Sequence, residues 1–302
     1  MTSLMHTQVG PFTLIDQIGL GGVAELWEAA HVDDGRRYAV KILRAERMAE
    51  PQQVKSLETE FAILEQVRHP ALPVGRRWVE VAGRPAFVMD LIPGENLGTV
   101  FARKQKVDGL RCLRELADAA DFLHGHDLVH NDIKLDNCIL RPEGGIALVD
   151  LGNVRRIQWT NVITGIFRRS SGRIFGTPTY LAPELILGRK ATVKTDVYAL
   201  GVCAFLLITG RPPFIAATND ERLKANLSEV PPTLASRIPG IPVHAASVLD
   251  RCLAKKPQDR PDSAAEVRMA VEELLARVRN YRIRTPDPES LGRTTTIGVP
   301  RS

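Results

Sequence analysis

The stretch LVHNDIKLDN at residues 128–137 places Asp132 two residues before Lys134 and five residues before Asn137. A carboxylate such as Asp132 can accept the proton of an attacking hydroxyl group, and a nearby lysine can offset the charge of a phosphoryl group. The amide oxygen of Asn137 is a hard ligand that suits Mg²⁺. The stretch is therefore either a phosphoryl-transfer loop or a polar turn between two apolar runs.

A second acidic residue, Asp150, follows thirteen residues after Asn137. The intervening residues, CILRPEGGIALVD, form an apolar run, a Pro-Glu-Gly-Gly turn and a second apolar run, which predicts a β-hairpin. A hairpin returns its end to the level of its start, so we expect Asn137 and Asp150 to lie side by side as metal ligands. A simple polar turn does not predict this second carboxylate, and phosphoryl transfer is favoured.

Upstream, IGLGGVAEL at residues 18–26 places a glycine-rich turn between two apolar runs. Glycines let backbone N–H groups approach phosphate oxygens without a Cβ in the way, although an ordinary hairpin turn has the same pattern. No Lys-Ser/Thr pair follows, which excludes a Walker A loop. Lys41 ends a later strand, and Glu60 lies on the helix that follows, where its carboxylate can orient the lysine.

The front of the chain is strand-rich, with FTLIDQIG, AELWEAA and RRYAVKIL separated by GLGG and DDG turns. A helix is predicted over 51–69, where apolar residues recur at helical spacing. Helical patterns dominate after LIPGEN, as at 111–126 and 263–280. The pattern predicts an α+β protein with a small sheet-rich part, a hinge and a larger helical part.

The chain of 302 residues is 44% hydrophobic and 25% charged, which is typical of a globular protein with a substantial core. Its formal charge of +5 is modest and spread out, so no nucleic-acid partner is expected. Cys112, Cys138, Cys203 and Cys252 show no metal or disulfide spacing. Together with the lack of a signal-peptide pattern, this predicts reduced thiols in a cytoplasmic protein. The apolar segment 197–208 is too short for a membrane span and predicts a buried helix.

With these residues in view, the chain resembles Hanks-type serine/threonine protein kinases, in the style of the bacterial ones, over roughly residues 12–280. The motifs that carry the resemblance are GLGGVAEL, AVK, Glu60 nineteen residues after Lys41, HNDIKLDN, DLG at 150–152, GTPTYLAPE at 176–184, TDVYALG at 195–201 and DRP at 259–261. The resemblance implies a bilobal fold with an N-lobe at 12–89, a hinge at 90–96 and a C-lobe at 97–280. The residues 281–302 are expected to be a disordered tail.

The resemblance also implies a role for each matching residue. ATP would be the nucleotide, Mg²⁺ the metal with Mn²⁺ as an alternative, and proteins the substrates. The catalytic residues would be Asp132 as the base, Lys134 and Thr177, with Thr177 bridging the other two. The metal ligands would be Asn137 and Asp150. The nucleotide would contact Ile18, Gly19, Gly21, Gly22, Leu26, Ala39, Lys41, Glu60, Met89, Asp90, Ile92 and Ile139. Asp196 would brace the catalytic loop, and Glu184 would pair with Arg260.

Three positions depart from the family pattern, namely Ala24, Leu151 and Asn131. The first two are minor, but Asn131 replaces an arginine that meets a phosphate on the activation segment in most relatives. A neutral asparagine cannot form that charge-assisted pair. Residues 151–183 also contain five arginines and no acid, which indicates either a solvated basic loop or a docking surface for an acidic partner.

Two other functions share parts of the pattern. A pseudokinase scaffold keeps the fold without turnover, yet all six residues of the catalytic set are present here: Lys41, Glu60, Asp132, Lys134, Asn137 and Asp150. A small-molecule kinase shares the Asp and Asn loop but generally lacks the Ala-Pro-Glu segment at 182–184 with its Arg260 partner. The sequence therefore favours an active kinase that acts on proteins.

Overall fold

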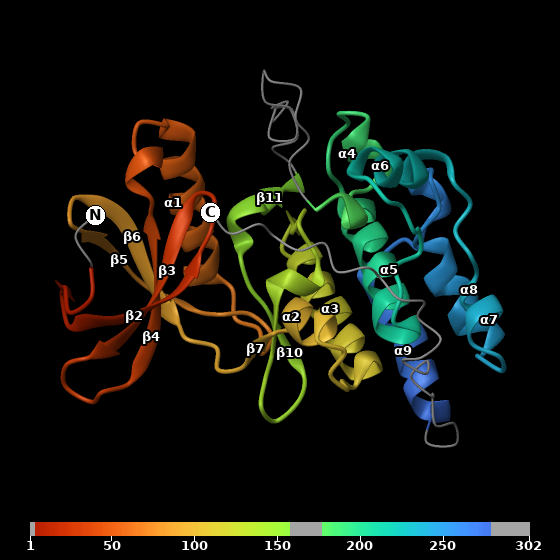
Figure 1. Cartoon of the computed structure of the whole chain (residues 1–302), viewed down its shortest axis with the longest axis horizontal. Helices are drawn as coiled ribbons and strands as arrows, with labels where there is room; N and C mark the ends of the chain where they lie inside the picture. The colour runs from red at the N-terminus through yellow and green to blue at the C-terminus, as the bar shows by residue number, and fades with distance from the viewer. Residues whose placement is uncertain (1–3, 158–176, 279–302) are drawn as a thin grey trace, which may run out of the picture.

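The computed structural model describes residues 4–157 and 177–278, which divide into a sheet-rich part and a helical part (Figure 1). The larger sheet is antiparallel, with the spatial order β1-β2-β3-β4-β6-β5. Its strands are β1 (Gln8–Val9), β2 (Phe12–Leu20), β3 (Ala24–His31), β4 (Arg37–Leu43), β5 (Gly75–Val81) and β6 (Arg84–Asp90). The three strands expected from the sequence are therefore β2, β3 and β4.

The two faces of this sheet are buried in different ways. One face carries a separate apolar cluster that includes Trp27, Val40 and Val88, and the N-terminal Val9 and Phe12 belong to that cluster. The other face packs against α1 (Pro51–Gln66), whose buried Leu57 and Leu64 join the main core. Alternate residues of a strand point to opposite faces, so β3, β4 and β6 contribute to both clusters.

The helical part packs around α5 (Val193–Thr209), which the structure buries almost entirely. Thr192 and Thr195 cap its start reciprocally, and Gly210, with φ of +72°, ends it in the left-handed conformation. The other helices are α2 (Leu97–Ala102), α3 (Gly109–His124), α4 (Pro183–Ile186), α6 (Asn219–Ser228), α7 (Leu234–Arg237), α8 (Val243–Arg251) and α9 (Ala264–Val278). Across the two described ranges, no helix has the length and apolar content of a membrane span.

Short strands connect the two parts. The predicted hairpin is present as β9 (Cys138–Leu140) and β10 (Ile146–Leu148), and β7 (Glu95–Asn96) pairs with β9. β8 (Leu128–Val129) pairs with β11 (Arg155–Arg156). The connection from β6 to β7 passes so close to β9 that a Cβ at Gly94 would collide with the carbonyl oxygen of Leu140. Glycine is required there, and it lets the connection lie directly on the helical part.

Candidate active site

Lys41 lies at the centre of a cluster of charges between the two parts of the chain. Its Nζ lies 2.7 Å from each carboxylate oxygen of Glu60 in α1, and 2.8 Å from Oδ1 of Asp150, which follows β10. The Glu60 side chain is only 3% exposed, so the pair is removed from water. The expectation that Glu60 orients Lys41 agrees with this geometry, and Asp150 is a third member of the cluster.

The electrostatics of the cluster keep Lys41 and Asp150 charged. Burial lowers the pKa of the Lys41 ammonium, but the carboxylates of Asp150 and Glu60 outweigh burial and raise that pKa above its ordinary value. In return, the nearby ammonium lowers the pKa of the Asp150 carboxyl to about 2. Asp150 therefore stays a carboxylate at physiological pH.

Asp132 lies in the loop after β8, and the hydrogen bonds that the described residues donate to its carboxylate all go to one oxygen, Oδ2. Oδ2 accepts hydrogen bonds from Nζ of Lys134 at 2.8 Å and from Nδ2 of Asn137 at 3.1 Å. Asn153, which the sequence had not indicated, adds a longer bond of 3.4 Å from its own Nδ2. Oδ1 has no hydrogen-bond partner among the residues that the structure describes. One oxygen is thus fixed, while the other remains available to accept a proton.

The predicted hairpin brings Asn137 and Asp150 to the same level. The backbone N–H of Val149 donates to the carbonyl oxygen of Asn137 at 2.8 Å, so the residue after Val149 lies beside Asn137. The Asn137 Nδ2 is used by Asp132, which leaves its Oδ1 for another partner. An amide oxygen and a carboxylate are the oxygen donors that suit Mg²⁺.

Asp196, at the start of α5, braces the catalytic loop as expected. Its carboxylate accepts the backbone N–H of His130 at 2.7 Å and of Asn131 at 2.8 Å, and it lies 2.9 Å from Nε2 of His124. The aspartate is 1% exposed, so these donors replace the water that a carboxylate would otherwise bind. The loop backbone is therefore anchored to the most buried helix of the larger part.

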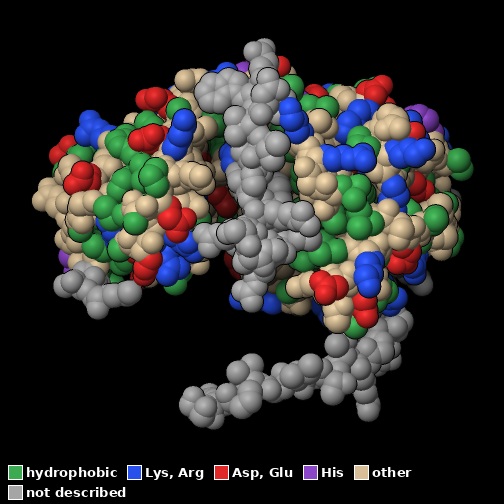
Figure 2. Space-filling view, turned by 90° about the horizontal axis from the view of Figure 1, so that it is seen from above, with side chains coloured by type: hydrophobic (Ala, Val, Ile, Leu, Met, Phe, Trp, Pro, Cys, Tyr) green, Lys and Arg blue, Asp and Glu red, His purple; other side chains and the backbone are tan. Residues whose placement is uncertain are grey.

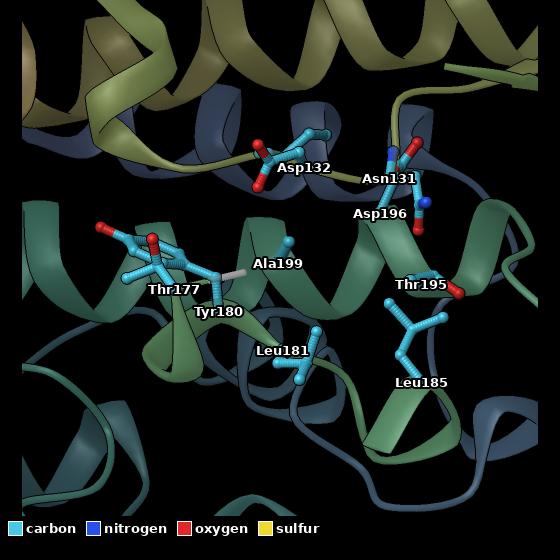
Figure 3. Close-up of a pocket in the computed structure, with 10 residues that line it drawn as sticks. Asn131, Asp132, Thr177, Tyr180, Leu181, Leu185, Thr195, Asp196 and Ala199 are labelled. Atoms are coloured by element: carbon cyan, nitrogen blue, oxygen red, sulfur yellow. The ribbon is translucent and has the colours of Figure 1, made fainter. Parts of the chain in front are cut away.

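Asn131 adopts a left-handed backbone conformation, with φ of +65°. Asparagine is enriched among the non-glycine residues that adopt this conformation. Its side chain lines a small cavity of about 20 Å³ together with Asp132, Thr177 and Asp196 (Figure 3). The structure therefore gives Asn131 a backbone role that the sequence analysis had not foreseen.

Thr177 lines the same cavity as Asp132 but lies across it, on the segment that leads to α4 (Figure 3). Within the described part of the chain, its side chain makes no hydrogen bond to Asp132 or Lys134. The bridge expected of Thr177 is therefore absent from this structure and stays a prediction. The arginine-rich residues 158–176 and the expected tail at 281–302 lie outside the described residues.

The glycine turn between β2 and β3 is held by two arginines that the sequence had not indicated. Nη1 of Arg44 donates to the carbonyl oxygen of Gly21 at 3.1 Å, and Nε of Arg47 donates to that of Gly22 at 3.1 Å. The N–H of Gly21 is used within the turn by the carbonyl of Ala24. Among the described residues, the N–H of Gly22 has no backbone partner, which leaves it available to a phosphate.

The residues expected around adenine belong to both parts of the chain. Leu26 in β3 pairs with Lys41 and Gly19, and Ala39 in β4 pairs with Met89 at the end of β6. Ile139 enters from β9, Ile92 lies half-buried beyond β6, and Ile18 is 43% exposed beside the glycine turn. Asp90 and Ile92 are expected to contact adenine through their backbone groups, and the Asp90 carboxylate accepts hydrogen bonds from Arg76 at 2.7 and 2.8 Å.

The comparison with known protein families agrees with this geometry. A family model described as the protein kinase domain matches residues 12–272. The chain belongs to the protein kinase family. The expected α+β, bilobal kinase fold is thereby confirmed, and membership of the kinase family implies ATP and a divalent metal in general.

Similar curated proteins include bacterial serine/threonine-protein kinases, as expected for a Hanks-type kinase. Pkn1 of Myxococcus xanthus is 33% identical over 285 residues, which cover 90% of this kinase chain and 39% of Pkn1. PknA of Mycobacterium tuberculosis is 29% identical over 303 residues, or 97% of the chain and 68% of PknA. PknH of the same species is 28% identical over 277 residues, which cover 91% of the chain and 43% of PknH. The kinase chain thus spans about two fifths of Pkn1 and PknH and two thirds of PknA.

Proposed function

We propose that this kinase transfers the γ-phosphate of ATP to serine and threonine hydroxyl groups of protein substrates, and that it also phosphorylates itself. The observation that supports this most strongly is the Asp132 carboxylate. One of its oxygens is fixed by Lys134 and Asn137, and the other is unpartnered among the described residues. The intact Lys41–Glu60 pair supports catalysis over a pseudokinase scaffold.

Each residue contributes one part of the proposed mechanism. Lys41, oriented by Glu60, binds the α- and β-phosphates of ATP, and the turn at Gly19–Gly22 covers the phosphates. Asp132 accepts the proton of the substrate hydroxyl through Oδ1, while Lys134 offsets charge on the transferred group. The adenine ring lies between Leu26 and Ala39 on one side and Ile139 on the other.

Asn137 and Asp150 are the residues that would hold the metal. Mg²⁺ usually takes one or two protein oxygens and completes its shell with water and substrate phosphates. A bound Mg²⁺ supplies charge neutralisation for the phosphates. Mn²⁺ is the alternative metal.

The direct test is transfer of radioactive γ-phosphate from ATP to a generic acceptor protein in the presence of Mg²⁺. Asp132→Asn is expected to lower kcat at least a hundredfold, because the proton acceptor is lost while the shape is kept. The same labelling reaction with sugars and aminoglycosides as acceptors tests the small-molecule alternative. Absence of protein labelling with either Mg²⁺ or Mn²⁺ contradicts the proposed function.

Activation is proposed not to require a phosphate that meets residue 131. The neutral Asn131 supports this, since it offers no charge to pair with a phosphate. Replacing Thr160, Thr164, Ser170 and Ser171 together with alanine should leave most kinase activity, measured as kcat/KM on an acceptor protein. A loss of several orders of magnitude would refute this prediction. Thr294–Thr296 in the expected tail are further proposed sites of autophosphorylation.

Two further expectations remain proposals. An acidic partner could bind the arginine-rich activation segment, whose charge supports such a contact. A cytoplasmic location is supported by the four cysteines, which are all free and buried. Phosphoproteomics that compares wild type with Asp132→Asn would identify the substrates.

A further inference from the structure

A second recess lies on the larger lobe, apart from Asp132. It is a groove of about 360 Å³ between α4, the end of α6 and the segment from Lys255 to Gln258. Its apolar walls include Pro183, Leu187 and Leu227, and the Leu187 side chain is 57% exposed. A groove of this volume is within the range of about 300–1,000 Å³ that binding pockets occupy.

Three cations and one acid line the groove, and the exposed acids Glu229 and Asp259 follow lining residues in the chain. Arg189 and Lys256 are exposed, and within the described ranges neither side chain makes an ion pair or a hydrogen bond. The one acidic residue of the lining, Glu184, is buried, and both of its oxygens are bonded to Arg260 at 2.8 Å. It therefore offers no negative charge to balance the two uncommitted cations.

A third cation, Lys255, also lines the groove. Its Nζ donates to the carbonyl oxygens of Ala225 and Asn226 at 2.9 Å and lies 4.2 Å from the centre of the Phe214 ring. These contacts fix Lys255 in place, so it adds positive potential without being free to move. Figure 2 looks onto the end of the larger lobe that carries α4 and α6, and it shows Lys and Arg side chains gathered beside hydrophobic ones.

We propose that this groove is a docking site for a short acidic segment of a protein substrate, with a leucine-like side chain in the groove and flanking Asp or Glu residues on Arg189 and Lys256. The proposal rests on the proposed function, since it names the substrate class. α4 directly follows the segment that carries Thr177, so a docked substrate would be tethered near Asp132. Such tethering raises the effective concentration of the acceptor.

The binding test needs no ATP and uses a fluorescent twelve-residue peptide with one leucine between two Glu-Glu pairs. Fluorescence polarisation should show binding that Arg189→Glu with Lys256→Glu weakens at least tenfold. The matched control, Lys104→Glu with Lys106→Glu, reverses two exposed charges in the loop between α2 and α3 and should change the Kd less than twofold. Replacing the peptide leucine with alanine should weaken binding at least threefold. This second test leaves the protein unchanged, so it remains valid even if the Arg189→Glu, Lys256→Glu variant does not fold.

A kinetic test connects docking to catalysis. Joining the acidic segment to a serine acceptor peptide should lower KM at least fivefold for wild type and not for the Arg189→Glu, Lys256→Glu variant. The kcat on the unlinked acceptor should be the same for both. A kinase that binds the peptide but labels no acceptor would contradict the proposed function and leave the docking site supported.

Three results would overturn the docking proposal. An equal loss of peptide affinity in the groove variant and the control variant would show a non-specific charge effect. Equal binding of the leucine and alanine peptides would show that the groove itself is not used. Displacement of the peptide by polyuridylate at a lower concentration than by the unlabelled peptide would indicate a nucleic-acid surface instead.

Discussion

Glu60 is a buried carboxylate that its ion pair with Lys41 stabilises. Its side chain is 3% exposed, and both oxygens accept from Lys41 at 2.7 Å. Burial raises the pKa of the Glu60 carboxyl, and the Lys41 ammonium opposes that rise. The lysine therefore has a structural task in addition to its proposed contact with phosphate.

Lys41→Met should destabilise the kinase by about 3 kcal/mol at pH 8, because it leaves a buried carboxylate without its cation. The pKa of Glu60 then rises further, so the folded state takes up a proton that the unfolded state releases. Stability of the variant is therefore expected to fall as pH rises from 5 to 8. Urea denaturation at several pH values measures this.

The control is Lys41→Met combined with Glu60→Gln, which removes the titrating group. Because Glu60 is absent, its free energy of unfolding should lack the decline that Lys41→Met shows as pH rises from 5 to 8. If Lys41→Met alone has the same pH profile as wild type, Glu60 is not the buried titrating group.

At the scale of elements, the glycine turn depends on the segment that follows β4. Arg44 and Arg47 bond the carbonyl oxygens of Gly21 and Gly22, on a turn that has few internal contacts. Glycine carries a large conformational entropy, and each such hydrogen bond contributes about 1 kcal/mol. The two arginines are thus positioned to hold the turn in one conformation.

Replacing both Arg44 and Arg47 with alanine should raise KM for ATP about five- to thirtyfold, since about 1–2 kcal/mol of preorganisation is lost. The kcat should stay within about threefold, because neither arginine reaches Asp132. Steady-state kinetics with varied ATP give both values. Arg37→Ala, which removes an exposed arginine of β4 that pairs with Glu28, is the control and should leave KM unchanged.

Arg260 connects the first turns of α4 and α5. This fully buried guanidinium bonds Glu184 twice and also donates to the carbonyl oxygens of Lys194 and Ala254. Arg260→Met should therefore cost about 3–5 kcal/mol in the free energy of unfolding, because Glu184 is left buried and unpaired. Chemical denaturation measures the loss.

Arg277→Met in α9 is the matched control. Arg277 is exposed and lies 4.0 Å from Glu273, a surface pair whose loss should cost less than about 1 kcal/mol. Comparable losses for both variants would show that the buried pair is not a special source of stability.

Sequence patterns predicted the elements with clear periodicity and the residues at their ends. Lys41, Glu60 and Asp150 were expected because strands, a helix and a hairpin fix where such residues lie. Arg44 and Arg47 were missed because their partners are backbone carbonyls, which leave no trace in the sequence. The strands β7, β8 and β11 have two residues each and are too short to show alternation. The hydrogen bond from the Asn131 N–H to Asp196 joins residues far apart in the chain, and local sequence does not reveal it.

At the scale of the whole molecule, side chains of β4 and α1 bond to the residues that follow β10. Lys41 bonds Asp150, and the Ser56 hydroxyl donates to the carbonyl oxygen of Gly152 at 3.0 Å. A nucleotide bound between the sheet and the larger lobe would add contacts to both. Ligands that bind only the folded state stabilise it by about 2.7 kcal/mol at a hundred times Kd.

Mg²⁺ and ATP together should therefore raise the Tm of wild type by about 4–8 °C in a thermal-shift assay. Asp150→Asn should keep the fold and reduce this rise to less than half, because the metal loses a charged ligand. Glu80→Gln, at an exposed position of β5, is the control and should respond like wild type. An undiminished rise in Asp150→Asn would exclude Asp150 as the metal ligand.

The N-terminal residues that cover the outer face of the sheet matter for anyone who trims this chain for expression. The family match begins at residue 12, yet Val9 is 4% exposed and Leu4 packs on the cluster that contains Phe12. The match ends at residue 272, inside α9 and before the buried Leu274. A fragment cut at the family boundaries would uncover apolar surface at both ends and tend to aggregate, whereas one that runs from residue 4 to 278 keeps both covers.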